Sequence, residues 1–234
     1  MPVECVNEPE YRVVGEPGLE GLTFTSSSKG HLTWPQAVEF CKARKSVLQS
    51  LREAVGFRCH AKGLDSADWH QTTRTTAVCF VDAGKRYVAI DDSPDPEENI
   101  ILARAEEAYR ACLSYDGWSL PLDDTHVKGI LARAEKGGRI APTPDRTYWR
   151  LRDEYVSQPL IRAMFGDMAQ AFATRLSSMG YDHSSGDAPT PKTEGVAIVR
   201  AVGIGVDSYN THNRFGAIQK YGLARGVHGS ISSG

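Results

Sequence analysis

The sequence lacks any long uninterrupted apolar segment. A membrane-spanning helix needs about 20 consecutive, predominantly apolar residues, and no run in this 234-residue chain approaches that length. The first residues, Met1-Pro2-Val3-Glu4, carry neither the basic nor the apolar segment of a secretory signal. We therefore expect a protein of the cytoplasm or of a virion that is not secreted and has no membrane partner.

An excess of charge of either sign is also missing, because 27 basic residues stand against 29 acidic ones. This balance argues against a protein that binds polyanions through its net charge, although it does not exclude a local basic patch. The chain has five cysteines at irregular spacing. An odd number does not suit a secreted disulfide framework, so we expect free thiols in a reducing compartment.

Nucleotide-binding loops and metallopeptidase motifs are absent as well. The chain has no Walker sequence. Gly203-Ile204-Gly205 lacks the third glycine and the helix of a dinucleotide-binding fingerprint. A hairpin followed by Pro-Glu-Glu resembles the layout of phage-type zinc peptidases, but residues 104–108 read Arg-Ala-Glu-Glu-Ala where His-Glu-x-x-His is required. We therefore predict no cofactor.

A β-hairpin predicted at residues 77–90 is the most regular feature that the sequence does contain. The apolar runs 77–81 and 87–90 flank a turn with Gly84, and β-branched and aromatic residues around such a turn are typical of a hairpin. Asp95-Pro96-Glu97-Glu98 then has the composition of a helix start, with Asp95 as the N-cap. The sequence thus predicts a hairpin that leads directly into a helix.

Capping residues predict two further helices. Thr33-Trp34-Pro35-Gln36 forms a capping box, and apolar residues at helical spacing continue to a stop at Gly56. A shorter helix begins at Asp123 or Asp124 and ends at a Gly-Gly pair. Helical sequence also runs from about residue 145 to 179 with a break at a proline, and residues 196–199 form a last candidate strand.

These patterns predict an α+β fold that is dominated by helices, with a small antiparallel hairpin-based sheet and extended terminal arms. We expect an N-terminal arm at residues 1–30, rich in Gly, Pro, Glu and Ser, and a globular core at residues 31–181. Residues 182–234 would form a linker, a strand and a Gly-rich C-terminal arm.

Three carboxylates at the ends of the hairpin strands are candidates for chemistry. Asp82 follows the first strand, and Asp91 and Asp92 end the second. RNase H-like nucleases place metal-binding carboxylates in this way, and such a cluster would bind the divalent cations of a hydrolase. Asp is also favoured in turns because of its local hydrogen bonds, which explains Asp82 without any chemistry.

The polar connection before the hairpin contains other reactive residue types, and Cys79 of the first hairpin strand is considered with them. Cys59, His60, His70 and Cys79 are zinc-binding types, but they lack the paired spacing of structural zinc sites. Cys59, His70 and Asp68 match a nucleophilic triad by type, without a helix N-terminus that would lower the thiol pKa. We therefore predict no metal ligand and no catalytic residue in this connection.

Positive charge and aromatic surface coincide at residues 146–152, which contain Arg146, Trp149, Arg150 and Arg152. Cations bind phosphates and aromatic rings stack on bases, so these four residues are candidates for nucleic-acid binding. The same pattern also arises in an amphipathic helix whose aromatic residues are packed while its arginines remain in solvent.

Residues 112–175 resemble the coat proteins of flexuous filamentous plant viruses. The resemblance rests on Cys112, Gly117-Trp118-Ser119, Pro159-Leu160-Ile161-Arg162 and the pattern Phe-x-Asp-x-Ala-x-Ala-Phe at residues 165–172. In that family a serine and an arginine line a pocket for the RNA backbone, which implies this role for Ser119 and Arg162. A hydroxyl group and a guanidinium group both bind phosphate oxygens.

The sequence therefore favours a non-enzymatic structural or assembly subunit of a viral or phage-like particle, a coat or capsid protein that contacts nucleic acid. Its expected partners are copies of itself or other particle subunits, together with RNA or DNA. The alternative is a small cytosolic metal-dependent nuclease or hydrolase that uses Asp82, Asp91 and Asp92.

Overall fold

The computed structural model describes residues 3–7, 10–13, 19–60, 71–112, 118–143, 148–181, 183–187, 191, 193–206, 211–214 and 223–229. The helices of this part are α1 (Trp34–Lys42), α2 (Leu51–His60), α3 (Ile100–Ala103), α4 (Ala105–Cys112), α5 (Thr125–Lys136), the π-helical turn η2 (Leu151–Tyr155), α6 (Pro159–Phe165) and α7 (Met168–Ser178). None of them combines the length and the apolar character that a helix needs to cross a membrane.

Strands of the described residues form two sheets. They are β1 (Val3–Asn7), β2 (Glu10–Val13), β3 (Thr23–Thr25), β4 (Val47–Leu48), β5 (Gln71–Asp82), β6 (Lys85–Asp91), β7 (Trp118–Pro121), β8 (Ile140–Pro142), β9 (Tyr148–Arg150), β10 (His183–Asp187), β11 (Val196–Val206), β12 (Thr211–Arg214) and β13 (Gly226–His228).

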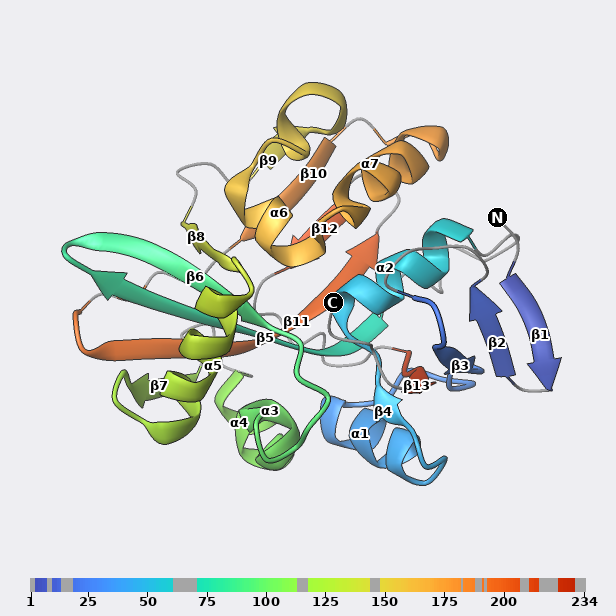
Figure 1. Cartoon of the computed structure of the whole chain (residues 1–234), viewed down its shortest axis with the longest axis horizontal. Coiled ribbons are helices and arrows are strands. Elements are labelled where there is room, and N and C mark those ends of the chain that lie inside the picture. Colours follow the sequence, from blue (N-terminus) through green and yellow to red (C-terminus); the bar gives the residue numbers. More distant parts are fainter. Residues whose placement is uncertain are drawn as a thin grey trace.

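The larger sheet lies at the centre of the molecule (Figure 1). Its strand order is β8-β6-β5-β11-β12-β10-β9, and β7 also pairs with β11. The neighbours pair antiparallel except β10 and β12, which are parallel. The long strands β5 and β11 therefore form the spine of the fold.

Helices cover both faces of this sheet. Cys79 of β5 and Val202 of β11 belong to a core that also contains residues of α2, α6 and α7. Val78 and Val199 point to the opposite core, which contains residues of α1, α3, α4 and α5. A strand buried on both faces needs apolar residues at successive positions, which explains the continuous apolar run that predicted the hairpin.

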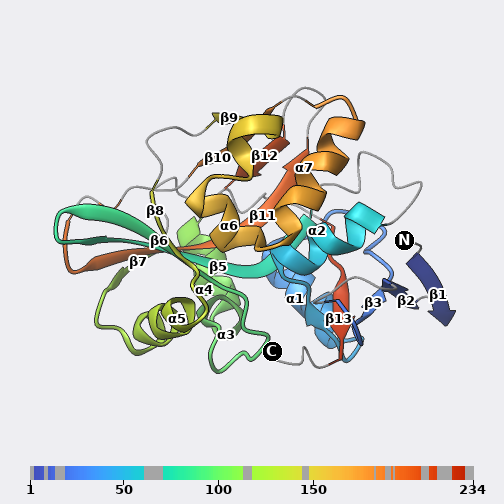
Figure 2. The same ribbon diagram turned by 45° about the horizontal axis from the view of Figure 1, so that its top comes forward.

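The smaller sheet has the strand order β1-β2-β3-β13-β4 and lies beside α2 (Figures 1 and 2). Its middle strand β13 comes from the C-terminal part of the chain and pairs with β3 and β4. Phe24 and Val227 pack on Phe57 of α2 in a third apolar cluster. The smaller sheet is thus completed by pairing of the C-terminal strand β13 with strands from the N-terminal part of the chain.

The predicted α+β class is confirmed, but the prediction of a small hairpin-based sheet and extended terminal arms is wrong for the described residues. The hairpin is one part of a sheet of eight strands. Phe24 and Val227, which lie in the predicted arms, are buried. Both differences arise because strands far apart in the sequence pair with one another.

The hairpin is confirmed, while the helix after it begins later than predicted. The turn residues Ala83 and Gly84 have φ values of 47° and 72°, as a two-residue hairpin turn of this hand requires. Asp95 forms a local turn by accepting a hydrogen bond from the N–H of Glu97 at 2.8 Å. The fully buried Asn99 is the N-cap instead, and its side chain accepts from two N–H groups of α3.

The helix predicted from Thr33 to Gly56 is two helices. The capping box at Thr33 is confirmed, but α1 ends near Lys42, and β4 precedes α2. Gly56 lies inside α2 rather than at a C-terminus. A glycine is needed there because a Cβ would come within 2.5 Å of the Leu19 side chain. The helix from Asp124 to Gly137 is confirmed with both caps.

Candidate functional site

A bulge in β5 organises the polar interior of the protein. Between the pairs Ala201↔Thr76 and Gly203↔Thr72, β11 advances by two residues and β5 by four. Residues 73–75 are therefore out of the regular ladder, and a bulge of this kind redirects side chains. Within it, the Thr73 hydroxyl donates to the carbonyl of Val202.

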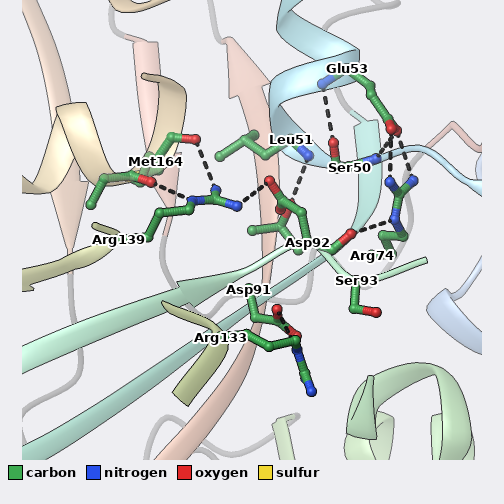
Figure 3. Close-up of polar contacts among 12 residues, drawn as sticks. Ser50, Leu51, Glu53, Arg74, Asp91, Asp92, Ser93, Arg133, Arg139 and Met164 are labelled. Carbon is green, nitrogen blue, oxygen red and sulfur yellow. Dashed lines mark hydrogen bonds and ion pairs between the residues drawn. The ribbon is translucent and has the colours of Figure 1, made fainter. Parts of the chain in front are cut away.

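Arg74, at the centre of the bulge, forms a buried ion pair with Glu53 of α2 (Figure 3). Its two terminal nitrogens each donate to one carboxylate oxygen of Glu53 at 2.7 Å. Further bonds reach the carbonyls of Leu48 at 2.7 Å and Asp92 at 2.9 Å. The exposed fractions of Arg74 and Glu53 are only 1% and 3%. One side chain thus joins β4, α2 and the end of β6.

Glu53 is fixed a second time by a capping box at the start of α2. Its carboxylate accepts a hydrogen bond from the N–H of Ser50 at 2.6 Å, and the Ser50 hydroxyl accepts from the N–H of Glu53 at 3.2 Å. Each carboxylate oxygen therefore has a partner, as a buried charge requires.

A second ion pair continues from the end of β6. Asp92 contacts Arg139 with 2.7 Å between Oδ2 and Nη1. Arg139 also donates to the carbonyls of Ala163 at 2.9 Å and Met164 at 3.3 Å at the end of α6. The other oxygen of Asp92 accepts from the hydroxyl of Thr75. We call Glu53, Arg74, Asp92 and Arg139 the ion-pair cluster.

Asp91 points to the other side of the sheet and is held by α5. Arg133 donates to its two oxygens at 3.1 and 2.9 Å and to the carbonyl of Glu98 at 2.9 Å. Figure 3 shows Asp91 and Asp92 directed away from one another. Adjacent residues of a strand face opposite sides, so this separation follows from the β-structure itself.

Both central arginines are held in the charged form. Burial lowers the pKa of Arg74. The charge of Glu53, the hydrogen bonds that Arg74 donates to it, and the charges of Asp92 and Asp91 outweigh that effect and raise the pKa overall. The pKa of Arg133 is raised mainly by its hydrogen bonds to Asp91. The guanidinium groups of Arg74 and Arg133 are therefore permanent positive charges, each matched by a carboxylate.

The three carboxylates predicted for a hydrolase do not converge. Asp91 is paired in register with Thr76, whereas Asp82 lies six residues further along β5, a separation of about 20 Å. Asp91 and Asp92 are each occupied by an arginine. The described residues contain no group of three potential metal ligands. Asp82, Asp91 and Asp92 therefore do not form the carboxylate cluster on which the metal-dependent nuclease or hydrolase alternative was based.

Substitutions of these carboxylates should affect stability rather than a metal-dependent activity. We expect Asp92→Asn to lower the free energy of unfolding by about 2 kcal/mol, because it weakens the pair with Arg139. Asp82→Asn, at the exposed turn, should change it by less than about 0.5 kcal/mol. Urea unfolding with and without Mg²⁺ measures both. Stabilisation of the wild type by Mg²⁺ that Asp82→Asn abolishes would contradict this assignment.

The cysteine candidates do not assemble a reactive site among the described residues. Cys41 carries a free thiol, while Cys59 lies in α2 and the buried Cys79 lies in β5. Burial raises the pKa of the Cys41 thiol to about 12, so it stays protonated at neutral pH and is a poor nucleophile. His60 ends α2, while Asp68 and His70 lie outside the described residues.

The nucleic-acid candidates are distributed over several elements. Trp149 and Arg150 lie in β9 and Arg152 in η2, whereas Arg146 lies outside the described residues. Ser119 is exposed on β7, and Arg162 is exposed on α6. Figures 1 and 2 both show β7 and α6 well apart, so Ser119 and Arg162 do not share a pocket. Nucleic-acid binding by the other residues stays a prediction.

Comparison with known proteins defines the fold. No family model matches the chain, and no curated protein is significantly similar to it in sequence. A solved structure described as "Accommodation of massive sequence variation in Nanoarchaeota by the C-type lectin fold" superposes with a TM-score of 0.61 and 11% sequence identity. The match covers 88% of this chain and 98% of that chain. The chain therefore has a C-type lectin-like fold.

This result corrects the resemblance to plant virus coat proteins, and with it the coat or capsid function. The fold likeness covers nearly the whole chain, whereas the motifs of the resemblance lie in residues 112–175 alone. Those motifs mark helix starts and turns, which recur in unrelated proteins. The expected self-association and nucleic-acid partners are independent of this correction and stay predictions.

Sequence reasoning did not find the ion-pair cluster. One signal for it was present, because Ser50-x-x-Glu53 has the spacing of a capping box. Arg74 stands in the polar run Gln71-Thr72-Thr73-Arg74-Thr75-Thr76, which is typical of an exposed strand. Its burial depends on Glu53 and on the bulge, and neither can be read from the strand alone.

Proposed function

We propose that this chain is a non-enzymatic recognition protein, in which a C-type lectin-like scaffold carries a surface that can vary in sequence. The observation that supports this best is the fold likeness at 11% identity to a structure described as accommodating massive sequence variation. A scaffold that persists while almost all side chains differ suits recognition, because binding residues can change without loss of the fold.

The ion pairs inside the protein also support this proposal, because they join separate helices and strands. The ion-pair cluster ties α2, the hairpin and the end of α6 together through the buried pair of Arg74 with Glu53 and the partly buried pair of Arg139 with Asp92. Asp91 and Arg133 similarly tie β6 to α5. A framework fixed by buried contacts leaves its periphery free to change, since substitutions away from such contacts usually have small effects on stability.

The part of the larger sheet formed by β9, β10 and β12 is where we place the variable surface. These short strands continue the larger sheet from β11 at one end and lie beside α6 and α7 (Figures 1 and 2). Binding residues are commonly carried at the margins of a rigid scaffold. Their residues include Tyr, Trp, Ser, His, Asn and Arg, which resembles the composition of adaptable binding surfaces.

A library experiment tests whether this surface tolerates variation. Residues 183–185 and 211–214 are randomised in one displayed library, and residues 74–80 of β5 in a matched control library. Protease resistance reports folding. We expect most members of the first library and few of the second to fold, because β5 is buried. Equal intolerance of the two libraries would contradict the proposal.

Arrays of purified proteins and glycans test recognition directly. The natural chain should bind at least one class of probe in a saturable manner, and randomised members that still fold should lose or change this binding. Retention of the same binding by folded members with many substitutions would place the recognition surface elsewhere and overturn the assignment to β9, β10 and β12.

A further inference from the structure

The segment of residues 223–228, which contains β13, lies between two strands from the N-terminal part of the chain. Val227 is paired with Phe24 of β3 on one side and with Val47 of β4 on the other, in both cases antiparallel. Figures 1 and 2 both show β13 beside these strands. A strand that is paired along both edges satisfies its backbone N–H and C=O groups on each side. The segment is thus held as a peptide is held by β-augmentation.

Two hydroxyl groups also bind the backbone of this segment. The Ser28 N–H donates to the carbonyl of Ala224 at 2.9 Å, and the Ser28 hydroxyl accepts from the N–H of Ala224 at 3.1 Å. The Thr25 hydroxyl accepts from the N–H of Gly226 at 2.9 Å. Ser28 and Thr25 are both buried, so these bonds satisfy backbone groups that water does not reach. They fix the position of the segment without selecting its side chains.

Arg225 is a side chain of the segment that the surrounding residues do select. Its exposed fraction is 4%. One terminal nitrogen donates to the carbonyl of Thr25 at 2.7 Å, and the guanidinium carbon lies 4.2 Å from the centre of the Phe57 ring. The Arg225 carbonyl accepts from the N–H of Gln49 at 3.0 Å. A side chain that stacks on a ring and donates to a carbonyl at the same time needs a planar cation, so lysine would not replace this arginine.

Close packing requires glycine at two positions in and after the segment. A Cβ at Gly226 would come within 2.7 Å of the Cβ of Ser46, which is itself buried. Gly229 has a φ of 106°, and a Cβ there would come within 2.5 Å of the carbonyl oxygen of Gly21. A well-packed interior does not accommodate approaches this close. The surroundings therefore fit an extended strand with the sequence Arg-Gly at residues 225–226.

The residues that bind the segment all lie early in the chain. The N–H of Thr72 adds one more hydrogen bond, to the carbonyl of Leu223 at 3.1 Å. We call these partners the acceptor site, which comprises residues 23–28, 46–49, 57 and 71–72. The segment itself follows β11 and β12 in the sequence. The acceptor site can therefore make the same contacts with a segment of its own chain or of another.

We infer that the acceptor site also receives residues 223–228 of a second copy of this chain, which gives a dimer joined by strand exchange. A second copy carries an identical segment, with Arg225 and Gly226 in place, and exchange of an identical element needs no new kind of contact. The segment of the same chain competes at a high effective concentration, so the dimer increases with protein concentration. The inference goes beyond the proposed recognition function and does not depend on it.

Disulfide trapping between two full-length variants tests the exchange. Thr23 and His228 are paired in the register, at a Cα separation that a disulfide can span. Thr23→Cys and His228→Cys are mixed and oxidised at concentrations from about 10 µM to about 1 mM, and mass spectrometry identifies the linked positions. We expect a 23–228 link between chains whose yield rises with concentration. Asp82→Cys, at the exposed hairpin turn, should give at least about tenfold less when it replaces His228→Cys. Absence of the 23–228 link, or equal yields, would overturn the inference.

Gly226→Val distinguishes strand exchange from other association, because its effect depends on which chain carries it. In the His228→Cys chain it should lower the yield of the link at least about tenfold, since valine does not fit beside Ser46. In the Thr23→Cys chain it should raise the yield at least about threefold, since the segment of that chain no longer competes for the acceptor site. Equal effects in the two chains would contradict strand exchange. If Gly226→Val fails to fold, Arg225→Ala replaces it with the same expected asymmetry.

Light scattering of the chain without introduced cysteines gives a second readout. The dimer fraction should rise over the same range of concentrations, and Gly226→Val alone should remain monomeric, because neither copy then supplies a segment that fits. An unmodified chain that stays monomeric up to about 1 mM, or a Gly226→Val variant that dimerises as the unmodified chain does, would rule out exchange of this segment.

Discussion

Replacing Arg74 with alanine should lower the free energy of unfolding by about 3–5 kcal/mol. The substitution leaves Glu53, which is only 3% exposed, as a buried charge without its main partner. It also removes the donors that reach the carbonyls of Leu48 and Asp92. Urea denaturation followed by circular dichroism measures the change.

Two comparisons make this result specific. Arg86→Ala, at an exposed position of β6, should change stability by less than about 0.5 kcal/mol. The double variant Arg74→Met/Glu53→Leu should be less destabilised than Arg74→Ala, because it removes both charges and retains apolar volume. A stability of Arg74→Ala equal to that of Arg86→Ala would show that the ion pair does not hold α2 to β5.

The second large effect is expected at Trp34, where α1 packs against the larger sheet. Its exposed fraction is 2%, and its indole N–H donates to the carbonyl of Thr73 at 3.0 Å. Trp34→Ala should cost about 3–5 kcal/mol, since it removes a large buried side chain and leaves a cavity. Trp34→Phe keeps most of the apolar volume and should cost about 1–2 kcal/mol through the unpaired carbonyl.

Thermal and urea unfolding of these two variants separate packing from hydrogen bonding. Glu39→Ala is the matched control on α1, because Glu39 forms only an exposed pair with Lys42, and such pairs contribute less than about 1 kcal/mol. Equal losses for Trp34→Phe and Trp34→Ala would mean that the hydrogen bond, and not burial, provides the contribution of Trp34.

Sequence reasoning succeeded where the signal was local. The hairpin, the capping box at Thr33 and the helix between Asp124 and Gly137 all depend on residues that are neighbours in sequence. It failed where two local signals competed. Asp95 and Asn99 are both good caps, and Asn99 prevails because its buried amide also donates to the carbonyls of Arg74 and Ser93.

Long-range pairing explains the remaining errors in the fold and the site. Nothing in residues 196–199 indicates that β11 lies at the centre of a sheet, and nothing in residues 223–229 indicates a partner near residue 24. The ion-pair cluster depends on the same kind of contact, because its members come from α2, β5 and the segments after β6 and α5. The C-type lectin-like fold, on which the proposed function rests, could not be recognised from the sequence. The similar structure shares only 11% sequence identity with this chain, so the likeness is visible in the structure alone.

The position of β13 between β3 and β4 has a consequence for how the chain folds. Val227 pairs with Phe24 and with Val47, so the smaller sheet cannot close until residue 228 has left the ribosome. Until then Phe24 and Phe57 lack the strand that covers them, and such late, non-local pairing slows folding. During synthesis, the apolar surface of the N-terminal segment therefore stays uncovered until β13 is available, and in that interval it is open to aggregation and to chaperones.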